Sequence, residues 1–236
     1  MSGEPVSLPR SEWTFHDLRT GKPVSDVRFD RLYPRWARTV SPRHWTPVEI
    51  ARRAAQLLVR DKTDRVLDVG SGVGKFCHIG ALTTSATFTG IEERPDLVRV
   101  AERVATQHGI EGAKFLLGNA LSFDWEPFNA IYLFNPFYEH VLNDEDDPFP
   151  IPGGTVRSQE RYDHETRTAF LKLLIARPGT RVVTYNGFGA PMPIGYRRLS
   201  LEPAGSDYLV LWEKMELTEL DVERETSSND SGVNLR

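Results

Sequence analysis

Three glycines and one aspartate stand close together in this 236-residue chain. Asp68 lies near the end of a short apolar run at residues 66–69, and Gly70, Gly72 and Gly74 follow at every second position. Glycine tolerates positive φ angles, and without a Cβ it lets a ligand approach the backbone. The spacing predicts a strand, a tight turn against a nucleotide-like ligand and the start of a helix. Asp68 would accept hydrogen bonds there from loop amides or from a ligand's ammonium group.

Two common glycine-rich loops do not fit this sequence. A P-loop needs glycine first and a hydroxyl last in Gly-x-x-x-x-Gly-Lys-Ser/Thr, but the chain has Val69 and Phe76 there. The dinucleotide fingerprint Gly-x-Gly-x-x-Gly needs a glycine where Lys75 stands. What remains is Gly-x-Gly-x-Gly preceded by an acidic residue. Its backbone would lie against the ligand at Gly70, Ser71 and Gly72.

Polar side chains also follow later apolar runs of the sequence. A carboxylate at Glu92 can accept hydrogen bonds from both hydroxyls of a ribose, as nicotinamide and adenosylmethionine sites require. Asn119 and Ala120 follow the next run, where an amide side chain can recognise the edge of an adenine ring. Asn135 follows the run after that. Because ligands bind at the carboxyl ends of the strands in open α/β sheets, these residues are expected to line one site.

Short apolar runs alternate with amphipathic segments along the chain. A helix is expected from residue 48 to about 59. Thr46 offers a capping hydroxyl, Pro47 suits the first turn and Glu49 completes a capping box. Strands are expected at 66–69, 87–91, 114–117, 130–134 and 181–185, and a hairpin at 197–201 and 208–212. This order predicts an α/β fold with a doubly wound, mostly parallel, seven-stranded sheet of Rossmann-like type.

The composition narrows the class of protein. With a formal charge of −4 and a pI near 5.9, the chain gives no global electrostatic case for binding nucleic acid. The single cysteine, Cys77, excludes a disulfide framework and a cysteine-based zinc site. The histidines show no metal-ligand spacing, so no metal is expected. Because no signal peptide and no membrane-length apolar run are visible, we expect a cytoplasmic protein with no membrane partner.

The sequence divides into three expected parts. Residues 1–45 are rich in aromatic and basic side chains interrupted by prolines, which indicates one or two short helices joined by loops. This cap segment would either supply substrate contacts or pack its aromatic side chains for stability alone. Residues 46–216 form the expected α/β core. Residues 217–236 are polar and uncapped, and we expect a disordered tail there.

The stretch from 66 to 140 resembles the core of class I S-adenosylmethionine-dependent methyltransferases. Asp-Val-Gly-Ser-Gly-Val-Gly at 68–74 and Gly-Ile-Glu at 90–92 resemble the non-SET, seven-stranded histone-lysine methyltransferases and their bacterial relatives. The resemblance implies S-adenosylmethionine as the cofactor, contacted by Asp68, Gly70, Glu92 and Asn119. The other residues predicted to bind it are Ser71, Gly72, Ala120 and Asn135. The substrate does not carry over, because this chain lacks the long basic segments with which those eukaryotic enzymes bind nucleosomes.

Asn-Pro-Phe-Tyr at 135–138 resembles the Asn/Asp-Pro-Pro-Tyr/Phe motif of amino-group methyltransferases. There an amide or carboxylate and a neighbouring carbonyl hold a planar nitrogen while an aromatic ring stacks on it. The resemblance implies catalytic roles for Asn135 and Tyr138 by positioning, without a strong base. His140 is the nearby candidate for a titrating base. Phe137 stands in place of the second proline, so the alternative is that Asn135 only orders the methionine end of the cofactor.

These features predict an S-adenosylmethionine-dependent methyltransferase. The acceptor would be a nitrogen or oxygen of a protein or small molecule; nucleic acid is disfavoured by the charge. One alternative is an adenosylmethionine-binding module without catalysis. Another is a nicotinamide-dependent oxidoreductase, which the glycine spacing and the lack of a Tyr-x-x-x-Lys-like pair disfavour. The sequence does not fix the oligomeric state.

Overall fold

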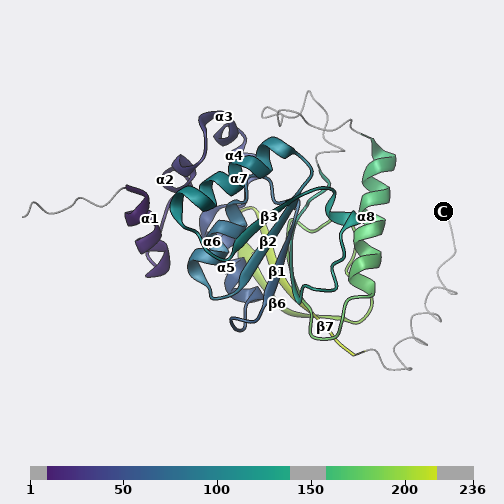
Figure 1. Cartoon of the computed structure of the whole chain (residues 1–236). Helices are drawn as coiled ribbons and strands as arrows, with labels where there is room; N and C mark the ends of the chain where they lie inside the picture. The colour runs from purple at the N-terminus through teal and green to yellow at the C-terminus, as the bar shows by residue number, and fades with distance from the viewer. Residues whose placement is uncertain (1–9, 139–157, 217–236) are drawn as a thin grey trace, which may run out of the picture.

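A seven-stranded sheet forms the centre of the molecule (Figure 1). The computed structural model describes residues 10–138 and 158–216, and in it the strand order is β3-β2-β1-β4-β5-β7-β6. The strands are β1 (Arg65–Val69), β2 (Thr87–Glu92), β3 (Ala113–Leu117), β4 (Ala130–Phe134), β5 (Arg181–Tyr185), β6 (Tyr196–Ala204) and β7 (Asp207–Lys214). The first five are parallel, whereas β7 pairs antiparallel with β5 and with β6. The predicted mostly parallel seven-stranded sheet is therefore confirmed.

The helices cover both faces of this sheet (Figure 1). They are α1 (Arg10–Arg19), α2 (Asp26–Phe29), α3 (Arg35–Arg38), α4 (Ser41–His44), α5 (Val48–Leu58), α6 (Lys75–Thr83), α7 (Pro95–His108) and α8 (Gln159–Leu174), with 3-10 turns η1 (Asp30–Leu32) and η2 (Ala120–Ser122). Strand residues alternate between two apolar clusters: Val66 and Tyr132 face α5–α7 and the N-terminal helices, whereas Leu67 and Ile131 face α8. The alternation follows the two-residue period of a strand. None of the described helices is long and apolar enough to span a membrane.

The N-terminal segment packs on the same face as α5, α6 and α7 (Figure 1). The sequence predicts one or two short helices there, but the described part holds α1 to α4 and η1. Its aromatic side chains Phe15, Phe29 and Tyr33 are buried in the core. The Tyr33 hydroxyl lies 2.9 Å from His78 Nδ1 on α6. Periodicity misses these helices because three of them are a single turn long, which is too short for a repeating apolar face.

An ion cluster around the buried ammonium of Lys75 joins this segment to the glycine loop. Lys75, at the start of α6, places its ammonium 2.6 Å from Asp26 Oδ1 and 2.7 Å from Asp30 Oδ1. The Lys75 and Asp30 side chains are largely buried, at 3% and 9% exposure. A buried ammonium is tolerated only when it is paired, so the two aspartates and Lys75 hold each other in place.

The start of α5 corrects one prediction. The N-cap residue is Pro47 rather than Thr46, and no side chain of the cap residue bonds the first turn. The Val48 N–H instead donates to Asp26 Oδ1 at 2.9 Å. Thr46 Oγ1 lies 2.9 Å from the Tyr132 hydroxyl on β4. A carboxylate distant in sequence thus replaces the local hydroxyl cap. The expected tail at 217–236 lies outside the described residues.

Candidate functional site

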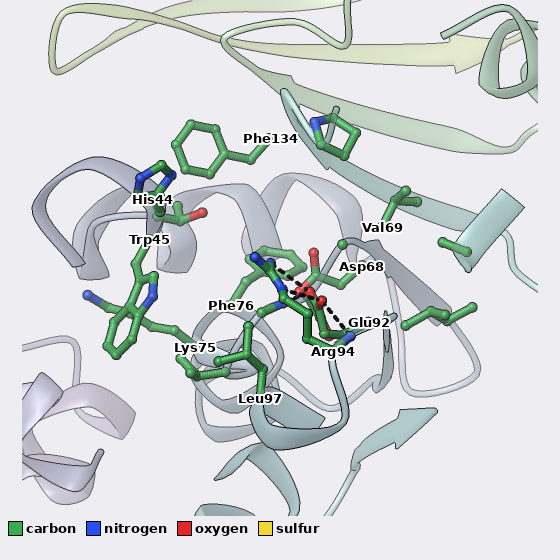
Figure 2. A pocket seen from close by; sticks show the side chains of 18 of the residues that line it. His44, Trp45, Asp68, Val69, Lys75, Phe76, Glu92, Arg94, Leu97 and Phe134 are labelled. Atoms are coloured by element: carbon green, nitrogen blue, oxygen red, sulfur yellow. Dashed lines mark hydrogen bonds and ion pairs between the residues drawn. The ribbon is translucent and has the colours of Figure 1, made fainter. Parts of the chain in front are cut away.

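A cavity of about 580 Å³ opens at the carboxyl ends of the central strands (Figure 2). All the residues predicted to bind the cofactor or to act in catalysis line it: Asp68, Gly70, Ser71, Gly72, Glu92, Asn119, Ala120, Asn135 and Tyr138. The N-terminal segment contributes a second set, including Trp36, Arg43 and His44. The position agrees with the rule that open α/β sheets bind ligands where the strand order reverses, here between β1 and β4. His140 lies outside the described residues.

Backbone hydrogen bonds to β2 and a close contact with Phe115 define the shape of the glycine loop. The N–H groups of Gly70 and Ser71 both donate to the Ile91 carbonyl at 3.0 Å, which joins the loop to the end of β2. Gly74 has φ 76°, and a Cβ at this position would collide with the Phe115 ring. Ser71 Oγ is buried and has no hydrogen-bond partner among the described residues. The hydroxyl lies against β2, where a Cβ at Gly90 would come within 2.5 Å of it.

Glu92 is buried at the end of β2 and is already hydrogen-bonded. Its Oε2 accepts from the Gly72 N–H at 2.9 Å. Its Oε1 accepts from Arg94 twice, from the backbone N–H at 3.0 Å and from Nε at 2.8 Å. Figure 2 shows this carboxylate and the Arg94 guanidinium side by side in the cavity. Arg94 Nη2 also lies 3.4 Å from Oε2. These donors occupy the roughly four acceptor positions of the carboxylate, so ribose hydroxyls would have to replace a contact from Arg94.

Asp68 lies at the end of β1, and its carboxylate is buried. The sequence predicts that it accepts from loop amides or from a ligand's ammonium group. The structure gives it the Cys77 thiol as donor, at 3.4 Å from Oδ2. Burial raises the pKa of Asp68 from 3.8 to about 7, the Cys77 hydrogen bond opposes this, and the charge of Glu92 adds to it. A cationic ligand group beside Asp68 would favour its ionised form.

Asn119 and Ala120 line the cavity at the end of β3. Asn119 Oδ1 accepts from the Leu121 N–H at 2.8 Å and so caps η2. Its amide NH₂ is then the end that can donate to a ligand.

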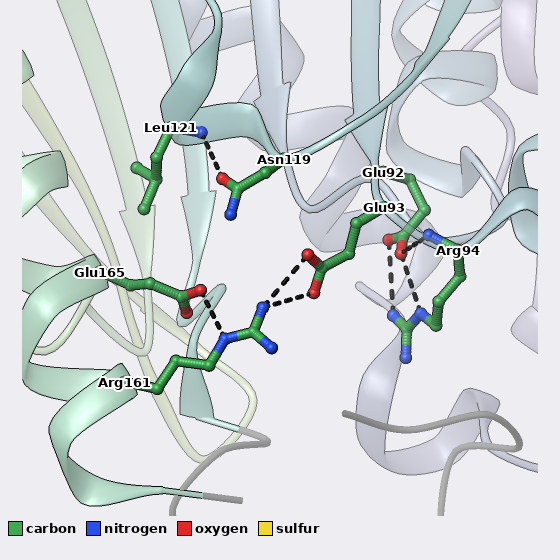
Figure 3. A network of polar contacts seen from close by, with 7 residues as sticks. All are labelled: Glu92, Glu93, Arg94, Asn119, Leu121, Arg161 and Glu165. Carbon is green, nitrogen blue, oxygen red and sulfur yellow. Dashed lines mark hydrogen bonds and ion pairs between the residues drawn. The ribbon is translucent and has the colours of Figure 1, made fainter. Parts of the chain in front are cut away.

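Arg161 of α8 bridges two carboxylates that line the cavity (Figure 3). Its Nη2 lies 2.8 Å from Glu93 Oε1 and its Nε lies 2.8 Å from Glu165 Oε1. Glu93 and Glu165 both line the cavity. Sequence analysis did not identify Glu165, because an acidic residue within a helix gives no local signal that it lines a cavity.

The end of β4 is strained and meets the end of β5. Asn135 has φ 37°, and its N–H donates to the Gly187 carbonyl at 3.0 Å. Asn186, with φ 55°, lines the same cavity. Residues other than glycine rarely adopt positive φ, and such strain clusters at functional sites. The Asn135 carbonyl accepts from the Tyr138 N–H at 3.2 Å, so these four residues form one compact corner.

Rings from the N-terminal segment and from β4 also line the cavity. Trp36 is 42% exposed and lines the cavity with Trp45. Figure 2 shows His44 beside Phe134, above Trp45 in this view. The segment thus packs aromatic residues in the core and also lines the cavity. That it supplies substrate contacts stays a prediction. Within residues 10–138 and 158–216, no group of three or more His, Cys, Asp or Glu residues could hold a metal ion.

These groups fit S-adenosylmethionine. Glu92 suits a ribose diol, the donor end of Asn119 suits adenine, and buried Asp68 suits an ammonium group.

Comparisons with known proteins agree with this assignment. Residues 60–166 match a family model described as a methyltransferase domain. No curated protein sequence matches the chain significantly.

Solved structures share the fold. An RNA methyltransferase from Salinibacter ruber in complex with S-adenosyl-L-homocysteine aligns with a TM-score of 0.52 at 23% identity, over 74% of this chain and 96% of that chain. TrmN from Thermus thermophilus aligns with a TM-score of 0.53 at 18% identity, over 76% of this chain and 52% of its own length. A mutant of MtNAS in complex with S-adenosylmethionine gives 0.50 at 17% identity, over 88% of this chain and 72% of that chain. At these identities the likeness shows the fold alone.

Proposed function

We propose that this chain, which carries a class I S-adenosylmethionine-dependent methyltransferase domain, transfers a methyl group to a nitrogen held by Asn135. The observation that carries the proposal is the strained corner at the ends of β4 and β5. Asn135 and Tyr138 lie there on the same cavity as Asp68 and Glu92. The arrangement puts an amide and an aromatic ring on the acceptor side and two carboxylates on the cofactor side.

The cofactor side would hold S-adenosylmethionine through the residues that line it. Glu92 would accept from the ribose hydroxyls, Asp68 from the ammonium group, and Asn119 would donate to adenine. The backbone of Gly70, Ser71, Gly72 and Ala120 would complete the wall. When bound, S-adenosylmethionine supplies a methyl group on a sulfonium that is already a good leaving group.

The acceptor side would act by positioning. The Asn135 amide oxygen can accept from an N–H of the acceptor, which aims the nitrogen lone pair and stabilises developing positive charge. The half-exposed Tyr138 side chain, 45% accessible, would pack on the acceptor and exclude water. The backbone hydrogen bond from Asn135 to Gly187 fixes the strained geometry that this needs.

A protein or small molecule remains the proposed acceptor. The formal charge of −4 gives no general attraction to nucleic acid. The Salinibacter ruber relative is an RNA methyltransferase, so RNA belongs in the acceptor test. The finer resemblance to the non-SET histone-lysine methyltransferases stays a prediction from residues 68–74 and 90–92. The boundaries 1–45 and 46–216 also stay predictions.

An oxygen acceptor is the second candidate, because His44 lines the cavity beside Phe134. A hydroxyl acceptor needs its proton removed during transfer, and an imidazole is the side chain best suited to take it near neutral pH. A nitrogen acceptor with a free lone pair has no such need.

The test is methyl transfer from S-[methyl-³H]adenosylmethionine to separated small-molecule, protein and RNA fractions of a cell extract. The variants are Asn135→Gly, which keeps the positive φ but removes the amide, and His44→Ala. S-adenosylhomocysteine affinity, measured by calorimetry, is the folding and cofactor control. We expect Asn135→Gly to reduce transfer about 100-fold, with affinity changed less than about threefold.

The outcomes separate the candidates. Loss of transfer in His44→Ala with full activity in Asn135→Gly would replace the nitrogen acceptor by the oxygen one. Full binding of S-adenosylmethionine without transfer to any fraction would favour the module without catalysis. Label in the RNA fraction alone would overturn the proposed acceptor class.

A further inference from the structure

We propose that the methyl acceptor is a small molecule with a carboxylate or phosphate group, which Arg31 and Arg35 of the N-terminal segment attract to the mouth of the cavity. The inference rests on the proposed methyl transfer and names the substrate class for it. The anionic group is a handle for binding and is distinct from the atom that receives the methyl group.

Positive charge is concentrated in one short stretch of the N-terminal segment. Residues 31–45 contain no acidic residue and four arginines: Arg31, Arg35, Arg38 and Arg43. Arg31 and Arg35 are exposed. Within the described part of the chain neither of them forms an ion pair, whereas the preceding cation, Arg28, lies 2.7 Å from Asp17. The field of these two guanidinium groups therefore acts on ligands outside the chain.

Arg35 is located at the mouth of the cavity. The next residue, Trp36, lines the cavity and is 42% exposed, so it lies where the cavity meets solvent. Both belong to the single-turn helix α3, which Figure 1 shows at the periphery of the molecule. Arg31 lies in the adjacent turn η1, whose Asp30 is paired with Lys75, a residue of the cavity wall. Charges act over about 8 Å at physiological ionic strength, which is far enough for a side chain beside Trp36 to attract an entering ligand.

The acidic side chains of the cavity come from other elements. They are located at or directly after the ends of β1 and β2 and on α8: Asp68, Glu92, Glu93 and Glu165. No described lining residue from the N-terminal segment or from the ends of β4 and β5 is acidic. The acidic elements suit the positive charges of S-adenosylmethionine, whereas the N-terminal segment favours an acceptor of negative charge. A lysine-rich peptide would be repelled by the same segment.

The size of the cavity favours a small acceptor over a macromolecule. Its volume of about 580 Å³ lies within the range of small-molecule sites, and S-adenosylmethionine would fill part of it. Carboxylate and phosphate groups both match the donors of a guanidinium, so the experiment has to separate them.

The test uses the metabolites of a cell extract, separated from macromolecules by dialysis and then divided by charge on an anion exchanger. Methyl transfer from S-[methyl-³H]adenosylmethionine should label the retained metabolites. Arg31→Gln/Arg35→Gln should raise the apparent KM for this fraction about tenfold at low salt and leave kcat unchanged, because the charges act on binding alone. Added NaCl should reduce the difference. Phosphatase treatment of the fraction abolishes labelling if the handle is a phosphate and preserves it if the handle is a carboxylate.

The matched control is Arg19→Gln/Lys114→Gln, which removes the same charge at two exposed positions outside the cavity wall. It should keep the KM of the unmodified protein, and both double variants should keep its calorimetric affinity for S-adenosylhomocysteine. An equal rise of KM in the two double variants would trace the effect to net charge and overturn the proposal.

The fraction that carries the label is a second, independent outcome. Label only in metabolites that the anion exchanger does not retain, or only in dialysed protein or RNA, would overturn the anionic small molecule and leave the methyl transfer intact. If the unmodified protein labels no fraction, the proposed methyl transfer itself fails, and the acceptor class fails with it.

Discussion

The two halves of the cavity are built in different ways. The cofactor half comes from the ends of β1, β2 and β3, where backbone N–H groups and carboxylates already satisfy one another, as Gly72 and Glu92 do. The acceptor half comes from the N-terminal segment and the ends of β4 and β5. It consists of rings such as Trp36 and Phe134 and of two asparagines in strained backbone conformations.

This difference separates the part of the cavity that we propose binds the cofactor from the part that we propose selects the methyl acceptor. The cofactor half depends on short loops that each follow their own strand, so its geometry is set locally. The acceptor half depends on the docking of a segment that is distant in sequence, held by Lys75 and by buried rings. The two halves meet at Lys75, which directly follows the glycine loop. Changes away from this contact should therefore leave the other half largely intact.

Lys75→Met should have the largest effect on the fold. It would leave Asp30 buried without its cation, and removing one partner of a buried pair typically destabilises by about 3 kcal/mol or more. Urea unfolding would measure this. Lys62→Met, at an exposed position, is the matched control and should be close to neutral. An unfolding midpoint of Lys75→Met equal to that of the control would show that the cluster does not hold the segment.

Asp68 should make cofactor binding depend on pH. Its pKa is raised to about 7, so below pH 7 an ammonium ligand must bind with release of a proton. S-adenosylhomocysteine affinity, corrected for the ligand's own titration, should rise about tenfold from pH 6 to pH 8. Asp68→Asn should flatten this rise. A rise that persists in the variant would assign the dependence to another group.

The same group has the opposite effect on the stability of the empty protein. Between pH 4 and pH 7 the unfolded chain has lost the Asp68 proton while the folded chain keeps it. The free energy of unfolding contributed by Asp68 therefore falls as the pH rises through this window.

Tyr33→Phe should have the smallest effect. It removes the hydrogen bond between Tyr33 of the N-terminal segment and His78 Nδ1. The free energy of unfolding should fall by about 1 kcal/mol. Burial lowers the pKa of His78 to about 3, so the ring stays neutral and the loss should not vary between pH 5 and pH 8. Thermal unfolding at several pH values would measure it. A loss that grows as the pH falls would mean that His78 titrates.

The two halves also differ in what the sequence reveals. The α/β class, the mostly parallel seven-stranded sheet and the closing hairpin were predictable, because strands and helices have distinct apolar periods and the glycine loop marks the first turn. The structure also brings Asp68, Glu92 and Asn119 to one cavity, as parallel strand ends require. Their roles toward the cofactor stay predictions.

What the sequence could not reveal depends on contacts between distant segments. The cap of α5 comes from Asp26 rather than Thr46. The ion pairs of Lys75 and the entry of His44 into the cavity have no local pattern either. Asn186 carried one usable signal, because an Asn-Gly pair favours positive φ.

The most direct test of the central claim is calorimetric titration of S-adenosylhomocysteine and NAD into the unmodified protein and into Glu92→Gln. Glu102→Gln, an exposed acid on α7, is the matched control. The unmodified protein and the control should bind S-adenosylhomocysteine and not NAD. Glu92→Gln should bind S-adenosylhomocysteine on the order of 100-fold more weakly, because it loses the hydrogen bonds proposed to the ribose. Binding of NAD alone, or full affinity in Glu92→Gln, would contradict the assignment of this cavity.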